Sequence, residues 1–153
     1  FYNLVIFLRE AKLNKERIFS LLHQNILTIV AILWAVKMVL QLLSSVPYFA
    51  NLAVTYLDFT IGYLHWTFLG VVTLSLFLFL DYFKLLCLNK KMLWLYVFGF
   101  LLTEALIFYK AIVSWQESTL ISEYIVILAI ASLVILVAVI GILLSSYRLE
   151  TKH

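Results

Sequence analysis

Six polar residues stand within or beside long apolar runs of this sequence, and they are the residues that could do chemistry. They are Lys37, Gln41, Asp58, His65, Glu104 and Lys110. A lysine and a glutamate inside a membrane can form a buried ion pair or part of an ion or proton pathway. A neutral imidazole can accept a hydrogen bond, relay a proton or bind a metal or haem. These residues form the candidate site, and the sequence assigns none of them a catalytic role.

The composition indicates that these residues belong to a membrane protein. The chain has 153 residues, of which 65% are hydrophobic and 12% are charged. Soluble domains are nearer one half apolar and about one quarter charged. One proline and four glycines favour long helices, and the alternating pattern typical of a membrane barrel is lacking. We therefore predict an all-α integral membrane bundle.

Four runs are long enough to cross a bilayer core, which needs about 20 apolar residues of helix. The predicted spans are residues 25–43, 59–80, 92–113 and 122–145. For residues 47–57 we predict a short helix in the outer interface, with Asp58 capping the second span. Residues 146–153 are a predicted cytoplasmic tail. Residues 1–24 are a cytoplasmic or interfacial segment, or the tail of an earlier span, because the chain opens on FYNLVIFL without Met.

The basic residues set the predicted orientation of these spans, since cytoplasmic loops carry an excess of Lys and Arg. Nine of the eleven Lys and Arg residues fall within residues 9–17, 84–91 and 148–152, which lie on one side. The two connections on the other side contain none. Both ends are therefore predicted to be cytoplasmic, and we expect a multi-pass protein of the cell's inner (plasma) membrane.

This orientation places the ionisable residues in the outer half of the membrane. At about 1.5 Å of rise per residue, Lys37 and Glu104 come to a similar depth. They are interpreted as an ion pair or as an ion or proton pathway. Lys110, near the outer end of its span, is expected to extend to the outer headgroups. His65 can hydrogen-bond Asp58 or a neighbouring carbonyl, bind a metal or haem, or relay protons.

The fourth span differs from the others because it has no ionisable residue between Tyr124 and Tyr147. It is therefore the best candidate for a lipid-facing helix. Gly141 and Ser145, four residues apart, would allow another helix to approach closely.

Several classes of site are excluded by residue type and placement. His23 and His65 are separated by most of the membrane thickness in this topology and cannot bind one haem iron. Cys87 is the only cysteine, which excludes an intrachain disulfide and a cysteine metal site. The sequence has no Gly-rich phosphate loop and no Ser/His/Asp arrangement. The basic run REAKLNKER alternates with Glu10 and Glu16, which indicates a solvated helix and no nucleic-acid surface.

One stretch of the sequence resembles a known family. The runs QLLSSVPYFANLA and YLDFTIGYLHWTFLGVVTLSLFLFL, within residues 41–80, are similar to the C-terminal part of bacterial multi-spanning proteins. Those proteins are distantly similar to haem–copper oxidase subunit I. The pattern IG-x-x-H-x-x-x-L-G maps onto Gly62, His65 and Gly70. The resemblance implies a respiratory setting with His65 as a metal or haem ligand, and haem or copper would then need further ligands outside this chain.

Three functions follow as expectations. The first is a non-catalytic membrane subunit, or fragment, of a larger complex, for which the resemblance implies a respiratory setting, with other membrane subunits or missing N-terminal spans as partners. The second is a part of an oxidase-like redox protein that uses His65. The third is an ion or proton transporter that uses Lys37 and Glu104. By itself, the chain is not expected to be an enzyme.

Overall fold

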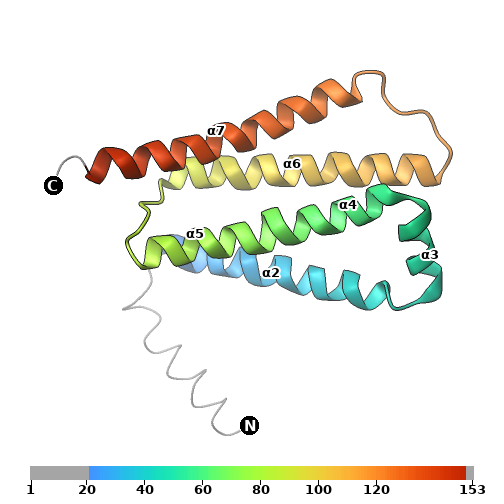
Figure 1. The fold of residues 1–153 in the computed structure, drawn as a ribbon, viewed down its shortest axis with the longest axis horizontal. Helices are drawn as coiled ribbons and strands as arrows, with labels where there is room; N and C mark the ends of the chain where they lie inside the picture. Colours follow the sequence, from blue (N-terminus) through green and yellow to red (C-terminus); the bar gives the residue numbers. More distant parts are fainter. Residues whose placement is uncertain (1–20, 151–153) are drawn as a thin grey trace, which may run out of the picture.

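A computed structural model describes residues 21–150 of the chain, and the side chains of residues 23–147. All regular structure in this part is helical (Figure 1). The elements are α2 (Leu21–Leu43), α3 (Pro47–Thr55), α4 (Leu57–His65), the π-helix η1 (Trp66–Val72), α5 (Thr73–Tyr82), α6 (Lys90–Trp115) and α7 (Tyr124–Glu150). Four helices, at His23–Leu43, Leu57–Tyr82, Lys90–Trp115 and Tyr124–Tyr147, are long and apolar enough to cross a membrane. The predicted all-α class with four such helices is therefore confirmed.

The helix ends follow from local sequence signals. Val46 has an extended backbone and precedes Pro47, which suits the first position of α3 because its missing N–H needs no partner there. The side chain of Asn89 accepts a hydrogen bond from the backbone N–H of Lys91 and caps α6. The predicted capping by Asp58 is wrong. The residue before α4 is Tyr56, no side chain caps that helix, and the carboxylate of Asp58 bonds elsewhere.

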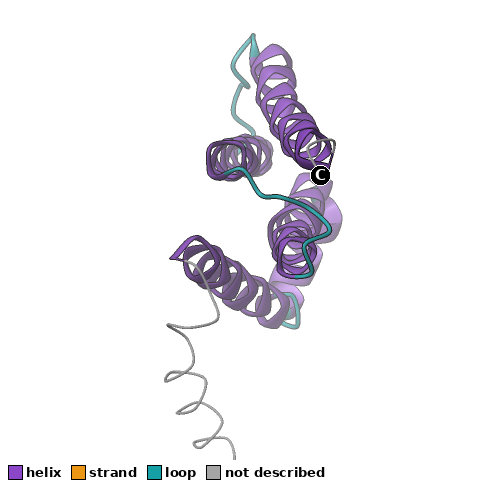
Figure 2. Cartoon of the chain, turned by 90° about the vertical axis from the view of Figure 1, so that its left-hand side faces the viewer, coloured by secondary structure: helices purple, strands orange, loops and turns teal. Residues whose placement is uncertain are grey.

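The long helices pack in chain order as an open row. α2 packs against η1 and α5, the α4–η1–α5 helix packs against α6, and α6 packs against α7. Figure 2 shows α2 and α7 at the two ends of this row, without closure into a ring. Only 11% of the most apolar stretch of α2 is buried, 17% of that of the α4–η1–α5 helix and of that of α7, and 44% of that of α6. α7 is thus as exposed as the α4–η1–α5 helix and less exposed than α2, so burial does not single it out, and its assignment as the lipid-facing helix stays a prediction.

The hydrophobic core lies in one half of the row, beside the connection between α5 and α6. It is built from α2, α5, α6 and α7 around Leu74, Tyr96 and Phe100, which are almost fully buried. Gly141 lets α7 approach α6 closely, since a Cβ there would lie 2.6 Å from the sulfur of Met92. The predicted close contact at Gly141 is therefore confirmed. In the other half, the helices leave room for a pocket.

The π-helix η1 is joined to both of its neighbours by side-chain hydrogen bonds. The indole N–H of Trp66 donates to the carbonyl of Leu33 on α2, at 2.9 Å. The hydroxyl of Tyr96 on α6 donates to the carbonyl of Leu69, also at 2.9 Å. π-helical turns are often found at functional sites, and this one begins directly after His65.

Candidate functional site

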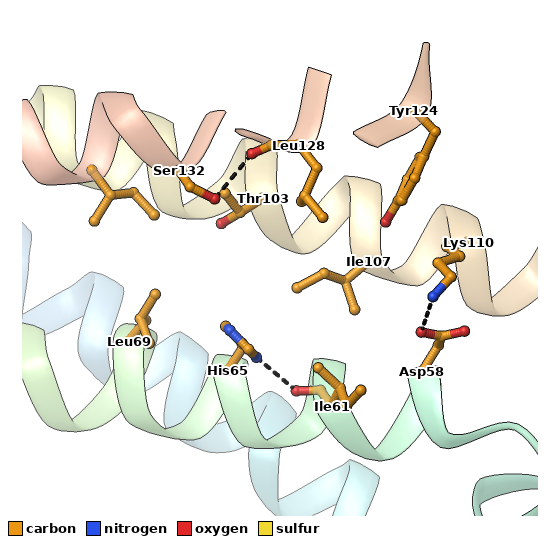
Figure 3. Close-up of a pocket in the computed structure, with 11 residues that line it drawn as sticks. Asp58, Ile61, His65, Leu69, Thr103, Ile107, Lys110, Tyr124, Leu128 and Ser132 are labelled. Carbon is orange, nitrogen blue, oxygen red and sulfur yellow. Dashed lines mark hydrogen bonds and ion pairs between the residues drawn. The ribbon is translucent and has the colours of Figure 1, made fainter. Parts of the chain in front are cut away.

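A pocket of about 400 Å³ opens between α4, α6 and α7 in the half of the molecule away from the core (Figure 3). It is lined by Asp58, Ile61, His65, Leu69, Thr103, Ile107, Lys110, Tyr124, Leu128, Ser132 and Ile135. Three of the six predicted site residues, Asp58, His65 and Lys110, meet here. Lys37, Gln41 and Glu104 are not among its lining residues.

An ion pair between two helices lies at one end of the pocket. The ammonium of Lys110 on α6 lies 2.8 Å from a carboxylate oxygen of Asp58 on α4. The Lys110 side chain is 39% exposed and that of Asp58 is 20% exposed. Lys110 was expected to extend to the outer headgroups, and this stays a prediction. In the structure it has a protein partner, because α4 and α6 are antiparallel neighbours and both residues lie at the same end.

His65 stands in the wall of the pocket with its ring orientation fixed. Its Nδ1 lies 3.1 Å from the carbonyl oxygen of Ile61. A carbonyl oxygen can only accept a hydrogen bond, so this contact assigns a proton to Nδ1, and in the neutral tautomer that matches it the lone pair is on Nε2. Figure 3 shows the ring pointing into the pocket. The predicted bond to a neighbouring carbonyl is confirmed, and the alternative bond to Asp58 is not formed.

Three hydroxyl groups complete the polar lining, and each donates its proton to a backbone carbonyl. Thr103 donates to Phe100 at 2.8 Å. Ser132 donates to Leu128 at 2.9 Å, and Tyr124 donates to Leu106 at 3.2 Å. The sequence reasoning missed Tyr124 and Ser132 as site residues. The spacing of Tyr124, Leu128 and Ser132, at four-residue intervals on one helix face, was the signal that could have found them.

Glu104, which follows the pocket residue Thr103 along α6, is the most unusual polar group of the described residues. It is 2% exposed, and neither of its carboxyl oxygens has a hydrogen-bond partner. Gly62 packs against Phe108 and Ile107, and Gly70 packs against Phe100. These two contacts show that α6 runs antiparallel to the α4–η1–α5 helix. Glu104 therefore lies level with the C-terminal end of α4, which is His65.

The predicted ion pair between Lys37 and Glu104 is wrong. The ammonium of Lys37 donates to the side-chain oxygen of Gln41, one turn along α2. The physical reason is the helix order, since the α4–η1–α5 helix packs against α2 on one side and α6 on the other. Similar depth in a membrane does not bring two residues together when a third helix separates them.

A second inter-helix pair lies at the opposite end of the molecule and was not predicted. Nε2 of His23 on α2 lies 2.7 Å from a carboxylate oxygen of Asp81 on α5. The other oxygen of Asp81 accepts the backbone N–H of Leu88 at 2.9 Å. His23 and His65 thus belong to separate clusters, as the sequence indicated.

The described residues include no group of three or more His, Cys, Asp or Glu side chains that could hold a metal ion. His65 on its own fits the role of one ligand, because metal-binding histidines commonly donate their other ring N–H to a carbonyl. Any further ligands would have to come from outside the described part of the chain. Cys87 is a free, exposed thiol.

Comparison of the chain with family models, with curated proteins and with solved structures found no match. The resemblance to the C-terminal part of oxidase-like membrane proteins therefore stays a prediction. The pocket, the buried Glu104 and the open helix row are the features of the molecule that bear on its function.

Proposed function

We propose that this chain is an integral membrane subunit of a larger complex, in which its open helix row is completed by helices of partner subunits. It has no catalytic role of its own in this proposal. The observation that carries the proposal is the laterally open pocket between α4 and α7, which places an ion pair, an imidazole and hydroxyl groups within apolar helices. Lipid chains cannot form hydrogen bonds with such groups, so polar residues at membrane depth usually face protein or a water-filled cavity.

The exposure of α7 supports the same proposal. Leu133 is 56% exposed, whereas Ala131 and Ala138 on the same helix are fully buried against the rest of the chain. The experiment is to place a photo-crosslinking amino acid at Leu133 in cells, with the same amino acid at Ala138 as the matched control. We expect Leu133 to yield one defined polypeptide adduct and Ala138 to yield only internal adducts. Adducts with lipid alone at Leu133 would overturn the proposal.

The orientation proposed for this subunit has both ends in the cytoplasm of a cell whose inner membrane it crosses. Cys87 offers a direct test, since it is the only cysteine of the chain and is exposed in the connection between α5 and α6. A membrane-impermeant thiol reagent should label it in inside-out vesicles and leave it unlabelled in intact cells. Labelling in intact cells would reverse the orientation.

A second candidate function is favoured by the geometry of His65. Its Nδ1 is held by the carbonyl of Ile61, so Nε2 presents a lone pair to the pocket. This arrangement suits one ligand of a metal or haem that a partner subunit would help to bind. Such a group would supply redox chemistry, and Nε2 of His65 would be one of the protein atoms that hold it. An optical difference spectrum with metal analysis of the native complex tests this, and a cofactor signal retained in His65→Ala would refute it.

A further inference from the structure

We propose that the pocket between α4, α6 and α7 binds a neutral amphipathic molecule with a hydroxyl donor at one end and a hydrogen-bond acceptor, such as an ester carbonyl, at the other. The inference concerns the ligand chemistry of the pocket and does not depend on the subunit role. It rests on an order of polar and apolar residues that three helices repeat along the pocket.

Each of the three helices lines the pocket with a polar residue, then an apolar residue, then a second polar residue. The order is Asp58, Ile61 and His65 on α4, Lys110, Ile107 and Thr103 on α6, and Tyr124, Leu128 and Ser132 on α7. The two polar residues of each helix are about 10–12 Å apart along its axis, at about 1.5 Å of rise per residue. Because α6 runs antiparallel to α4 and to α7, the three series run in the same direction (Figure 3). The pocket therefore has two polar ends and an apolar middle.

The end that holds Asp58 and Lys110, the ionic end, has no net charge. The ammonium of Lys110 carries three N–H groups, of which one donates to Asp58 at 2.8 Å. The other two have no hydrogen-bond partner among the described residues. A charged ligand would bring into this apolar setting a charge that the balanced ion pair does not compensate. The ligand is therefore neutral, and an acceptor on it meets the free N–H groups of Lys110.

The end that holds His65, Thr103 and Ser132, the acceptor end, is complementary to a donor. Thr103 and Ser132 each donate their hydroxyl proton to a carbonyl of their own helix, and such a hydroxyl keeps lone pairs with which it can accept. In the tautomer that matches the contact of Nδ1 with Ile61, Nε2 of His65 is an acceptor as well. An imidazole nitrogen is a stronger base than a hydroxyl oxygen, so the ligand's O–H group is directed at Nε2.

The middle of the pocket sets the body of the ligand. Ile61, Ile107 and Leu128 lie between the two ends, one from each helix. The volume of about 400 Å³ falls within the range of ordinary small-molecule pockets, about 300–1,000 Å³. The ligand that fits has an apolar body, such as an aromatic ring with a short chain, between its donor and its acceptor.

The test is equilibrium dialysis of the full chain in lipid nanodiscs against methyl 3-(4-hydroxyphenyl)propanoate, whose phenol and ester carbonyl lie at opposite ends of the molecule. Uptake by empty nanodiscs is subtracted, and a chelator keeps metal ions away from His65. We expect saturable binding of one molecule per chain. Uptake no greater than by empty nanodiscs would mean that the pocket holds only water or lipid, and the proposal would be wrong.

Three further probes test the two ends and the charge. The 4-methoxy analogue lacks the donor, 4-propylphenol lacks the acceptor, and tyramine carries an ammonium in place of the ester. We expect each of them to bind about fivefold to tenfold more weakly than the ester, the effect of one lost hydrogen bond. If any of the three bound as tightly as the ester, the ligand class proposed here would be refuted.

Two variants locate the hydrogen bonds, each read with a matched pair of probes. His65→Phe removes the acceptor Nε2 and should weaken binding of the phenol ester about fivefold, while binding of the methoxy analogue stays unchanged. Lys110→Met should likewise weaken binding of the ester and leave that of 4-propylphenol unchanged. Thr67→Val, which removes a hydroxyl outside the pocket, should change neither. Equal losses for both probes of a pair, or no loss for either, would contradict the assigned contacts.

Discussion

Substituting alanine for Gly70 tests whether η1 and α6 are packed as tightly as the structure indicates. A Cβ at Gly70 would lie 2.7 Å from Cζ of Phe100 and 3.3 Å from Cδ1 of Leu33. Phe100 is completely buried and stacks at a tilt against Trp66, with ring centroids 5.9 Å apart. The ring therefore has no room to retreat. Overpacking of this kind costs about 1–3 kcal/mol, and the helical preference of alanine over glycine returns up to about 1 kcal/mol.

We expect Gly70→Ala to lower the free energy of unfolding by about 1–2 kcal/mol. Gly141→Ala is the matched control, since its Cβ would meet the sulfur of Met92 at 2.6 Å. That distance is shorter, but a methionine side chain is flexible and fills irregular space. The Gly141 variant should therefore be neutral or gain up to about 1 kcal/mol.

The assay is reversible unfolding of both variants in bicelles by steric trapping, with wild type measured alongside. Contact distance alone would rank Gly141→Ala as the more damaging change. A result in that order, or a Gly70 variant as stable as wild type, would refute the packing argument.

Three further changes test the polar contacts by the same unfolding assay. A double-mutant cycle of Asp58→Asn and Lys110→Met should give a coupling energy of about 1 kcal/mol, because the pair is partly exposed. Zero coupling would mean that the ion pair does not stabilise the contact between α4 and α6. Tyr96→Phe should cost about 1 kcal/mol through loss of its bond to the carbonyl of Leu69, with exposed Tyr48→Phe as a silent control; equal effects would contradict that bond. Glu104→Leu should stabilise the isolated chain by about 1–3 kcal/mol, since the buried carboxyl has no partner to lose; a large destabilisation would mean that Glu104 has a partner.

The helices could be predicted from the sequence because length and apolar content alone determine which segments can cross a membrane. Residues 25–43, 59–80 and 92–113 fall inside the observed helices, and α7 begins two residues later than predicted and continues to Glu150. The carbonyl bond of His65 was foreseeable as well, since it involves a residue one turn away on the same helix.

The pairing of residues on different helices could not be predicted. The sequence gives an approximate depth for each side chain, but it does not give the order in which the helices pack. Lys37 and Glu104 have similar predicted depths but are separated by the α4–η1–α5 helix. Lys110 and Asp58 were both predicted to lie towards the outer side, but their contact requires α4 and α6 to be neighbours. The π-helix was not predicted either, and the contacts that Trp66 and Gly70 make are with residues of α2 and α6.

The central claim is that this open helix row is one part of a larger membrane complex. Native mass spectrometry of the protein, extracted from its own membrane in lipid nanodiscs, tests this most directly. We predict a particle that contains this chain and at least one other polypeptide in fixed stoichiometry. A particle that contains only this chain and lipid would contradict the account.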